Sequence, residues 1–144
     1  MKKCSEVMTK NPVCCMPTDA VSKAAQSMKK ENVGSIPVIE GEQTQKLVGI
    51  VTDRDLAMKV VAVERDAKTT IVADVMTHKI ITCRLEDDIQ KAVAAMAEHQ
   101  LRRMPVVDGE GKIVGIISQA DVATRVNLPE GTAKMVKDIS QPTA

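Results

Sequence analysis

The chain has 144 residues, 44% of them hydrophobic and 27% charged, with a formal net charge of +1. This length allows a compact domain with a core, and the near-neutral charge gives no electrostatic reason to expect binding to nucleic acid or to a membrane surface. Because Phe, Trp and Tyr are absent, the core must be aliphatic and no aromatic ring can stack on a base. No apolar run is long enough to span a membrane, and the polar N-terminus does not resemble a secretory signal. We therefore expect a cytoplasmic protein.

Short apolar runs and helical periodicities alternate along the first half of the chain. The run before Pro17 is typical of a strand. The residues after Thr18-Asp19 carry apolar side chains at spacings of three and four, which predicts a helix that Asn32 to Gly34 terminates. The predicted elements are a strand at 13–16, a helix from 18 to about 31, strands at 36–39 and 46–52 around a turn at 40–41, and a helix from about 53.

The second half of the chain repeats the first. Val7-Met8-Thr9 returns as Val75-Met76-Thr77, and Leu47 to Thr52 returns as Ile113 to Ser118. The first copy has two extra residues in its hairpin loop, where insertions are tolerated. The predicted elements of this half are a strand at 80–83, a helix from about 87 that carries Ile89, Ala92, Val93 and Met96 on one face, strands at 104–107 and 113–118, and a helix at 119–126.

These patterns predict an α+β fold built from two copies of one unit, each of which cannot usually bury its own apolar face alone. The predicted boundaries are repeat 1 at 1–63, a charged linker at 64–71, repeat 2 at 72–126 and a tail at 127–144. Within the tail, Val136 to Ser140 resembles Val72 to Met76. This segment is either a short helix packed in an analogous place or a frayed terminus.

Four cysteines occur, at positions 4, 14, 15 and 83, and none forms a C-x-x-C pair. With only two histidines, the chain offers no zinc-binding pattern, and we expect reduced thiols. Cys15 and Cys83 are equivalent in the two repeats, which favours a packing role over a thiol-sensing role.

The order strand-helix-strand-strand-helix resembles the CBS domain, which is named after cystathionine beta-synthase. Its marks are Ile36-Pro37-Val38-Ile39 before the hairpin and Gly49 to Asp55 after it, and both recur in the second repeat. Two such domains in tandem resemble a stand-alone Bateman module. The resemblance implies two β-α-β-β-α repeats packed with pseudo-twofold symmetry, two clefts between them and homodimers of modules. It also implies adenosine ligands, namely AMP, ADP or ATP, or else NAD or S-adenosylmethionine.

Thr52 to Asp55 and Ser118 to Asp121 lie where a strand becomes a helix. An aspartate at this position can accept hydrogen bonds from both ribose hydroxyls, and a hydroxyl beside a helix N-terminus can hold a phosphate. The same pattern is also a capping box that needs no ligand. Because the pattern recurs in both copies of a family that uses these positions for nucleotides, we favour binding in at least one cleft.

In the CBS family each cleft takes its entrance strand and the residues before proline from one repeat, and the hydroxyl and aspartate from the other. The resemblance therefore implies two pockets. The first consists of Thr9, Val13, Cys14, Gly34, Ser35 and Ile36 with Ser118 and Asp121. The second consists of Thr77, Ile81, Thr82, Arg102, Arg103 and Met104 with Thr52 and Asp55. The residues expected to hold the base are Val13, Ile36, Ile81 and Met104.

Arginine makes forked contacts with phosphate, so we expect the second pocket to bind nucleotide phosphates more tightly. The alternative is that Arg102 and Arg103 are ordinary surface residues or that one of them pairs with Asp55.

The favoured hypothesis is a regulatory sensor that changes its arrangement when an adenine nucleotide binds and is read by a regulated protein that the sequence does not identify. The alternative is a structural or interaction module with vestigial clefts. An enzyme is not expected, because His78 and His99 belong to no catalytic motif and there is no P-loop or G-x-G-x-x-G. We expect no required cofactor and no metal.

Overall fold

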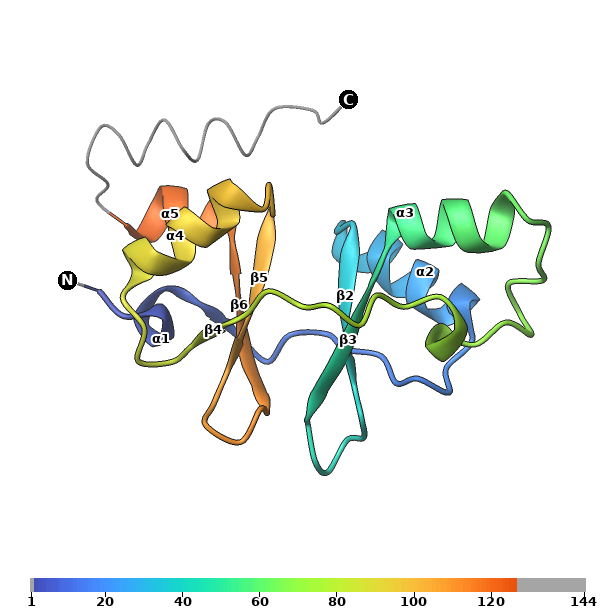
Figure 1. The fold of residues 1–144 in the computed structure, drawn as a ribbon, viewed down its shortest axis with the longest axis horizontal. Coiled ribbons are helices and arrows are strands. Elements are labelled where there is room, and N and C mark those ends of the chain that lie inside the picture. Colours follow the sequence, from blue (N-terminus) through green and yellow to red (C-terminus); the bar gives the residue numbers. More distant parts are fainter. Residues whose placement is uncertain (1, 127–144) are drawn as a thin grey trace. The chain divides into compact units, whose positions relative to one another are not determined.

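The computed structural model describes residues 2–126 and shows mixed helices and strands (Figure 1). The chain forms two compact units. We call Val13–Ile80 the middle unit, and the residues up to Pro12 together with those from Ile81 onward the terminal unit. The predicted short helix at 136–140 lies outside the described residues.

The terminal unit is built on a four-stranded sheet in the order β1-β6-β5-β4. Strand β6 is antiparallel to both β1 and β5, and β4 runs parallel to β5. In Figure 1 the β5–β6 hairpin leads directly into α5. The elements are α1 (Cys4–Val7), β1 (Thr9–Lys10), β4 (Cys83–Arg84), α4 (Ile89–Glu98), β5 (Arg103–Val107), β6 (Ile113–Ser118) and α5 (Gln119–Arg125).

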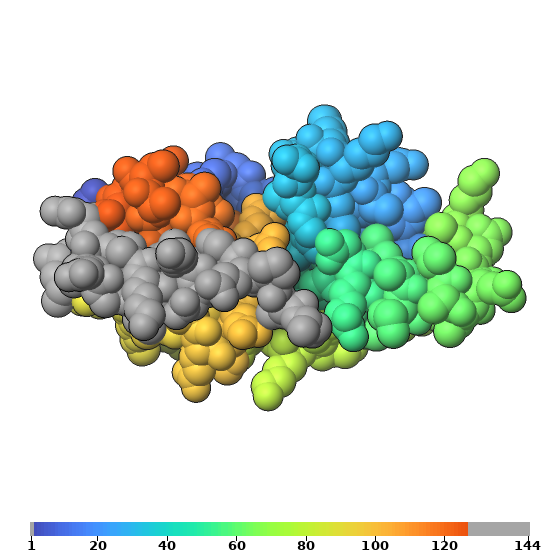
Figure 2. All heavy atoms as spheres, turned by 90° about the horizontal axis from the view of Figure 1, so that it is seen from above, coloured from blue at the N-terminus to red at the C-terminus, as the bar shows by residue number. Residues whose placement is uncertain are grey.

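The middle unit contains the β2–β3 hairpin, and two isolated bridges replace the outer strands. Cys15 bridges Val38 in parallel, and Thr77 bridges Ile50 in antiparallel orientation. Figure 2 shows α2 (blue) lying against α3 and the helical turn after it (green). The elements are α2 (Val21–Glu31), β2 (Ser35–Ile39), β3 (Leu47–Thr52), α3 (Asp53–Leu56), the π-helix η1 (Ala57–Val61) and the 3-10 helix η2 (Val72–Asp74).

The predicted helical faces are confirmed by burial except at Ala25, which the spacing places on the apolar face of α2 and which is exposed. Ile89, Ala92, Val93 and Met96 of α4 are all buried in the core of the terminal unit. In α2, Val21, Ala24 and Met28 are buried in the core of the middle unit. The helix α2 begins at Val21, later than predicted, because the Asp19 carboxylate accepts a hydrogen bond from the Met16 N–H at 2.8 Å and holds a turn before it.

Two predicted strands are much shorter than expected. Within residues 13–16 the β-bridge is formed by Cys15, and the strand predicted at 80–83 is β4, Cys83–Arg84. Cys15 donates to the Pro37 carbonyl at 3.0 Å and accepts from the Ile39 N–H at 2.9 Å. Extending this parallel ladder toward Val13 would need an N–H from Pro37, which proline lacks. Pro105 sits at the corresponding place in β5, opposite the residues before Cys83.

Each repeat contributes its first residues to the unit formed by the other repeat. We call residues 4–10 and 72–78 the entrance segments. The Cys4 N–H donates to the Asp87 carbonyl at 2.9 Å, and the Val72 N–H donates to the Asp19 carbonyl at 2.8 Å. Thr9 then pairs with Ile116 of the second repeat. The two entrance segments are therefore exchanged between the repeats.

The entrance segments cross the hairpin strands at a glycine in each unit. A Cβ atom on Gly115 would lie 2.5 Å from Met8 Sδ and 3.0 Å from the Thr9 carbonyl oxygen. A Cβ atom on Gly49 would lie 2.9 Å from Met76 Sδ and 3.0 Å from the Thr77 carbonyl oxygen. Because ordinary contacts are longer than these, both positions require a residue without a side chain.

Candidate functional site

The helices after β3 and β6 both begin with a complete capping box. Thr52 Oγ1 accepts from the Asp55 N–H at 3.0 Å, and the Thr52 N–H donates to Asp55 Oδ2 at 3.0 Å. Ser118 and Asp121 form the same reciprocal pair, with both distances 3.0 Å. The capping interpretation of these motifs is therefore confirmed, and the capping bonds place both aspartates in a fixed orientation.

Each aspartate also binds the threonine of an entrance segment. Thr77 Oγ1 donates to Asp55, lying 3.2 Å from both carboxylate oxygens. Thr9 Oγ1 lies 3.1 and 3.2 Å from the two oxygens of Asp121. The structure thus brings together Thr77, Thr52 and Asp55 in the middle unit. The corresponding set in the terminal unit is Thr9, Ser118 and Asp121.

A cation four residues after each aspartate completes each set. Lys59 Nζ lies 3.0 Å from Asp55 Oδ1 and donates to the Val75 carbonyl at 2.9 Å. Arg125 Nε lies 3.9 Å from Asp121 Oδ1. Its Nη1 donates to the carbonyls of Val7 and Met8 at 3.0 and 3.1 Å. We call each set of threonine, aspartate and cation a clasp, because it fastens an entrance segment to a helix N-terminus.

Lys59 and Arg125 were not predicted from the sequence. The signal that could have found them is a basic residue four positions after each aspartate, on the same face of the helix. Lys59 and Arg125 also occupy equivalent positions in the two repeats, as Val75 and Val7 do. The side chains of both cations are about half exposed, at 47% and 48%, whereas those of Asp55 and Asp121 are only 9% and 11% exposed.

The two clasps differ in the length of their ion pair and in the residues beside the aspartate. The Lys59–Asp55 ion pair is short, whereas Arg125 and Asp121 are 3.9 Å apart. A second carboxylate, that of Asp53, accepts from the Arg54 N–H at 2.8 Å beside Asp55. In the terminal unit the neutral Gln119 occupies this position. The extra carboxylate of Asp53 is matched by the cation Arg54, which stands where the terminal unit has Ala120, so the two helix N-termini have the same formal charge.

Apart from the entrance threonines Thr9 and Thr77 and the hydroxyls of the capping boxes, the residues predicted to line each pocket around the base and phosphates belong to the compact unit that does not hold its aspartate. For the first pocket these residues are in the middle unit, and for the second they are in the terminal unit. Within the terminal unit, Arg103 faces Ser118 across the β5–β6 ladder, and the Arg102 carbonyl accepts from the Gln119 N–H at 2.9 Å. Arg102 is exposed and Arg103 is half-buried.

The residues predicted to hold a base have different exposures. Ile36 and Met104 are 1% and 0% exposed and pack into the two cores. Their side chains belong to the cores of the two units, and their role in holding a base stays a prediction. Val13 is 42% exposed and Ile81 is half-buried. The remaining predicted residues are exposed or half-buried, namely Cys14, Gly34, Ser35 and Thr82.

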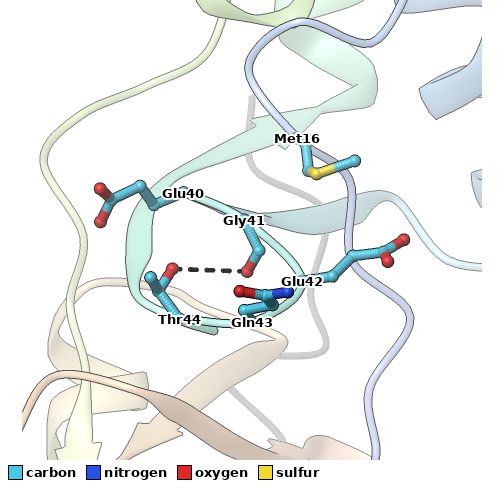
Figure 3. A pocket seen from close by; sticks show the side chains of 6 residues that line it. All are labelled: Met16, Glu40, Gly41, Glu42, Gln43 and Thr44. Atoms are coloured by element: carbon cyan, nitrogen blue, oxygen red, sulfur yellow. Dashed lines mark hydrogen bonds between the residues drawn. The ribbon is translucent and has the colours of Figure 1, made fainter.

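A shallow depression lies beside the β2–β3 loop of the middle unit (Figure 3). Met16 lines it from the segment before Pro17, and Glu40 and Glu42 line it from the loop. Thr44 Oγ1 donates to the Gly41 carbonyl at 3.4 Å and shapes the turn. With two glutamates in its lining, the depression does not suit a phosphate, and it contains none of the predicted site residues.

Two observations on residues 2–126 bear on other classes of function. No group of three or more His, Cys, Asp or Glu side chains in this part of the chain could hold a metal ion. Among the same residues, no helix is long and apolar enough to cross a membrane.

Comparison with known proteins gives consistent matches. The CBS domain family matches residues 4–62 and 72–127. The Bacillus subtilis protein YlbB is 36% identical over 141 residues, which cover 98% of this chain and 93% of YlbB. The crystal structure of Hypoxic Response Protein I with two coordinated zinc ions superposes with a TM-score of 0.77 at 28% identity, covering 88% of this chain and 100% of that one. The crystal structure of CBSX2 in complex with AMP has a TM-score of 0.72 at 27% identity, covering 85% and 94% of the two chains.

Proposed function

The chain belongs to the CBS-domain family and carries two CBS domains, and from this premise we propose that it is a regulatory module that binds AMP, ADP or ATP. The observation that carries the proposal is the repeated set of two hydroxyls around one carboxylate, formed by Thr77, Thr52 and Asp55 and by its counterpart in the terminal unit. Further support comes from CBSX2, a similar structure that contains AMP.

The clasp suggests how binding is coupled to a change in arrangement. Each aspartate already accepts from a backbone N–H and from the hydroxyl of an entrance threonine. A ribose that hydrogen-bonds Asp55 or Asp121 therefore competes with Thr77 or Thr9. Binding would loosen one end of an entrance segment. The shift between the fastened and the loosened arrangement can be only as large as the difference between the ligand's affinities for them.

The residues predicted to line the pockets indicate how the base and the phosphates of a nucleotide would be held. The base would lie against aliphatic surface and strand backbone, with the exposed Val13 and the half-buried Ile81 as the available side chains. Its edge can hydrogen-bond main-chain groups of the segments that lead to Cys15 and to Cys83, where proline ends the ladder. Phosphates would face Arg102 and Arg103 at the start of β5.

Thermal unfolding with AMP, ADP, ATP, NAD and S-adenosylmethionine tests the proposal. A dye must report unfolding, because the chain has no Trp or Tyr. At about 100 times its dissociation constant a ligand should stabilise the wild type by about 2.7 kcal/mol. Asp55→Asn or Asp121→Asn should abolish the shift, and the matched control Glu31→Gln, which neutralises an exposed carboxylate on α2, should retain it. The absence of a shift with all five ligands would contradict the proposal.

We further propose that the pocket containing Arg102 and Arg103 is the tighter one for phosphates. Arg103→Ala should weaken ATP binding more than tenfold, equivalent to more than about 1.4 kcal/mol, because a charged hydrogen bond to phosphate is lost. Isothermal titration of ATP measures the change, with Arg65→Ala as a control at an exposed arginine of the middle unit.

Combining Arg103→Ala with Asp55→Asn or with Asp121→Asn then shows which aspartate shares a ligand with Arg103, since only residues around one ligand give non-additive losses. Unchanged ATP affinity in Arg103→Ala would exclude the arginine as a phosphate contact.

A structural module with vestigial clefts is the second candidate. The clasps favour it, because both aspartates already have protein partners that account for their positions. In that case Asp55→Asn would lower stability while no nucleotide shifts the unfolding of the wild type.

The remaining parts of the proposal concern the setting of the module. We propose that it acts without catalysis and without a required cofactor, in the cytoplasm, as a homodimer read by a regulated protein. Apolar side chains exposed on the middle unit support an interface with a second copy, and they are Met58, Val61 and Val63 at 54%, 73% and 58% exposure.

A further inference from the structure

Two cysteine side chains lie in the core of the terminal unit. Cys4 lies in α1 of the first entrance segment and Cys83 lies in β4, and they are 0% and 5% exposed. Helix α1 packs against β4, and Cys83 Sγ donates to the Pro105 carbonyl at 3.9 Å. The backbone fixes the packing of α1, because the Cys4 N–H donates to the Asp87 carbonyl at 2.9 Å and the Ser5 N–H donates to the Leu85 carbonyl at 3.1 Å. Both residues belong to the same apolar cluster.

The middle unit provides an internal comparison. There the equivalent of Cys83 is Cys15 and the equivalent of Cys4 is Val72. Val72 is held in the same way, since its N–H donates to the Asp19 carbonyl at 2.8 Å, and it is fully buried. Valine therefore satisfies the packing at this position, and packing alone does not require a second thiol in the terminal unit.

We propose that Cys4 and Cys83 are an oxidisable pair that a hydroperoxide converts into a disulfide. In the first step the Cys4 sulfur attacks one peroxide oxygen, the O–O bond breaks, and Cys4 becomes a sulfenic acid. The departing hydroxide takes up the proton lost by Cys4 and leaves as water. The Cys83 sulfur then attacks the Cys4 sulfur, the S–O bond breaks, and the hydroxide leaves with the Cys83 proton as a second water. The peroxide receives the two electrons that the thiols lose.

The environments of the four cysteines indicate which thiol attacks the peroxide. The neighbouring Cys83 thiol lowers the pKa of Cys4, whereas the Cys4 thiol and burial raise the pKa of Cys83. Burial raises the pKa of Cys14 to about 11 and that of Cys15 to about 12. Because the thiolate is the reactive form, Cys4 is the one best suited to attack the peroxide.

The disulfide would act on the entrance segment that ends in a clasp. Cys4 precedes Thr9, which binds Asp121. A bond between Cys4 and Cys83 would keep the segment in place when Thr9 is released. Because both sulfurs are buried, the peroxide reaches them when the short helix α1 opens locally. The oxidation does not depend on whether a nucleotide binds.

The experiment treats the full chain with hydrogen peroxide, alkylates the remaining thiols and maps the peptides by mass spectrometry. We expect a cross-linked pair of peptides containing Cys4 and Cys83, with Cys14 and Cys15 alkylated after unfolding. The midpoint of thermal unfolding should rise by about 10 °C, because the bond closes a long loop. Dithiothreitol should reverse both changes.

Cys4→Val is the matched control, because valine is the residue that the middle unit has at this position. The variant should unfold close to the midpoint of the reduced wild type and should show no rise with peroxide. Peptides that link other cysteines, a Cys4 oxidised without a partner, or an equal rise in Cys4→Val would each overturn the proposal. The peptide map of the wild type tests the pairing of Cys4 with Cys83 even if the variant folds poorly.

Discussion

Replacing Asp55 with alanine should lower the free energy of unfolding by about 3 kcal/mol, because it removes the acceptor on which one clasp depends. The Thr52 N–H, the Thr77 hydroxyl and the Lys59 ammonium all lose their shared partner. The cost stays below that of a fully buried ion pair, since Lys59 is 47% exposed and can turn toward water. Urea denaturation followed by circular dichroism measures the change.

A double-mutant cycle separates the clasp from a general effect of losing a charge. Thr77→Val removes only the hydroxyl that Asp55 accepts, so the two substitutions should be non-additive by about 1 kcal/mol. Asp121→Ala should cost less than Asp55→Ala, because Arg125 lies 3.9 Å from Asp121. Strict additivity of Asp55→Ala and Thr77→Val would show that the hydroxyl contributes nothing to the clasp.

Gly115→Ala should destabilise the protein by about 2 kcal/mol, because the new methyl group would overpack the crossing of the first entrance segment over β6. It would meet Met8 Sδ at 2.5 Å and the Thr9 carbonyl oxygen at 3.0 Å. The methionine can move, but the carbonyl belongs to the β1–β6 pairing and can move only if that pairing opens. The same urea titration reports the loss.

The same substitution at two further glycines serves as a comparison for Gly115→Ala. Gly49→Ala should cost somewhat less, since its methyl group would lie 2.9 Å from Met76 Sδ. Gly109→Ala should be nearly neutral, because no atom lies within 4 Å of the added carbon. If Gly115→Ala were as mild as Gly109→Ala, the entrance segment could not cross the strand as closely as the structure shows.

Periodicity and repetition predicted most of the elements, including the buried faces of α2 and α4 and the longer first hairpin loop. The loop is confirmed by its closing bonds, which join Glu40 to Lys46 and Asp108 to Lys112. The strands predicted near Val13 and Ile80 were too long. Their length depends on the partner strand, where a proline lacks the N–H that a longer ladder needs, and the residues of the predicted strand itself do not show this. Periodicity and repetition also could not predict the exchange of entrance segments. The two repeats have similar apolar faces, so these patterns do not show on which repeat an entrance segment packs.

The site was predictable where the chemistry is local. Thr52 and Ser118 with their aspartates were recognised from spacing within one turn, and the structure places them as capping boxes. The side chains of Ile36 and Met104 are buried in β2 and β5, and their expected contact with a base stays a prediction. Lys59 and Arg125 were not predicted as part of the site. They donate to the backbone carbonyls of Val75 and Val7, and a contact with a backbone carbonyl does not depend on the type of residue that carries it.

The exchange of entrance segments also dictates an order of events during synthesis. Thr9 and Asp121 are 112 positions apart along the chain, whereas Thr77 and Asp55 are 22 apart. A chain emerging from the ribosome can therefore complete the middle unit while the first entrance segment still waits for β6 to be made. Closing the longer loop also costs more entropy. We expect the terminal unit to form last, and the interval before it forms is when the newly made N-terminal segment is open to proteases and chaperones.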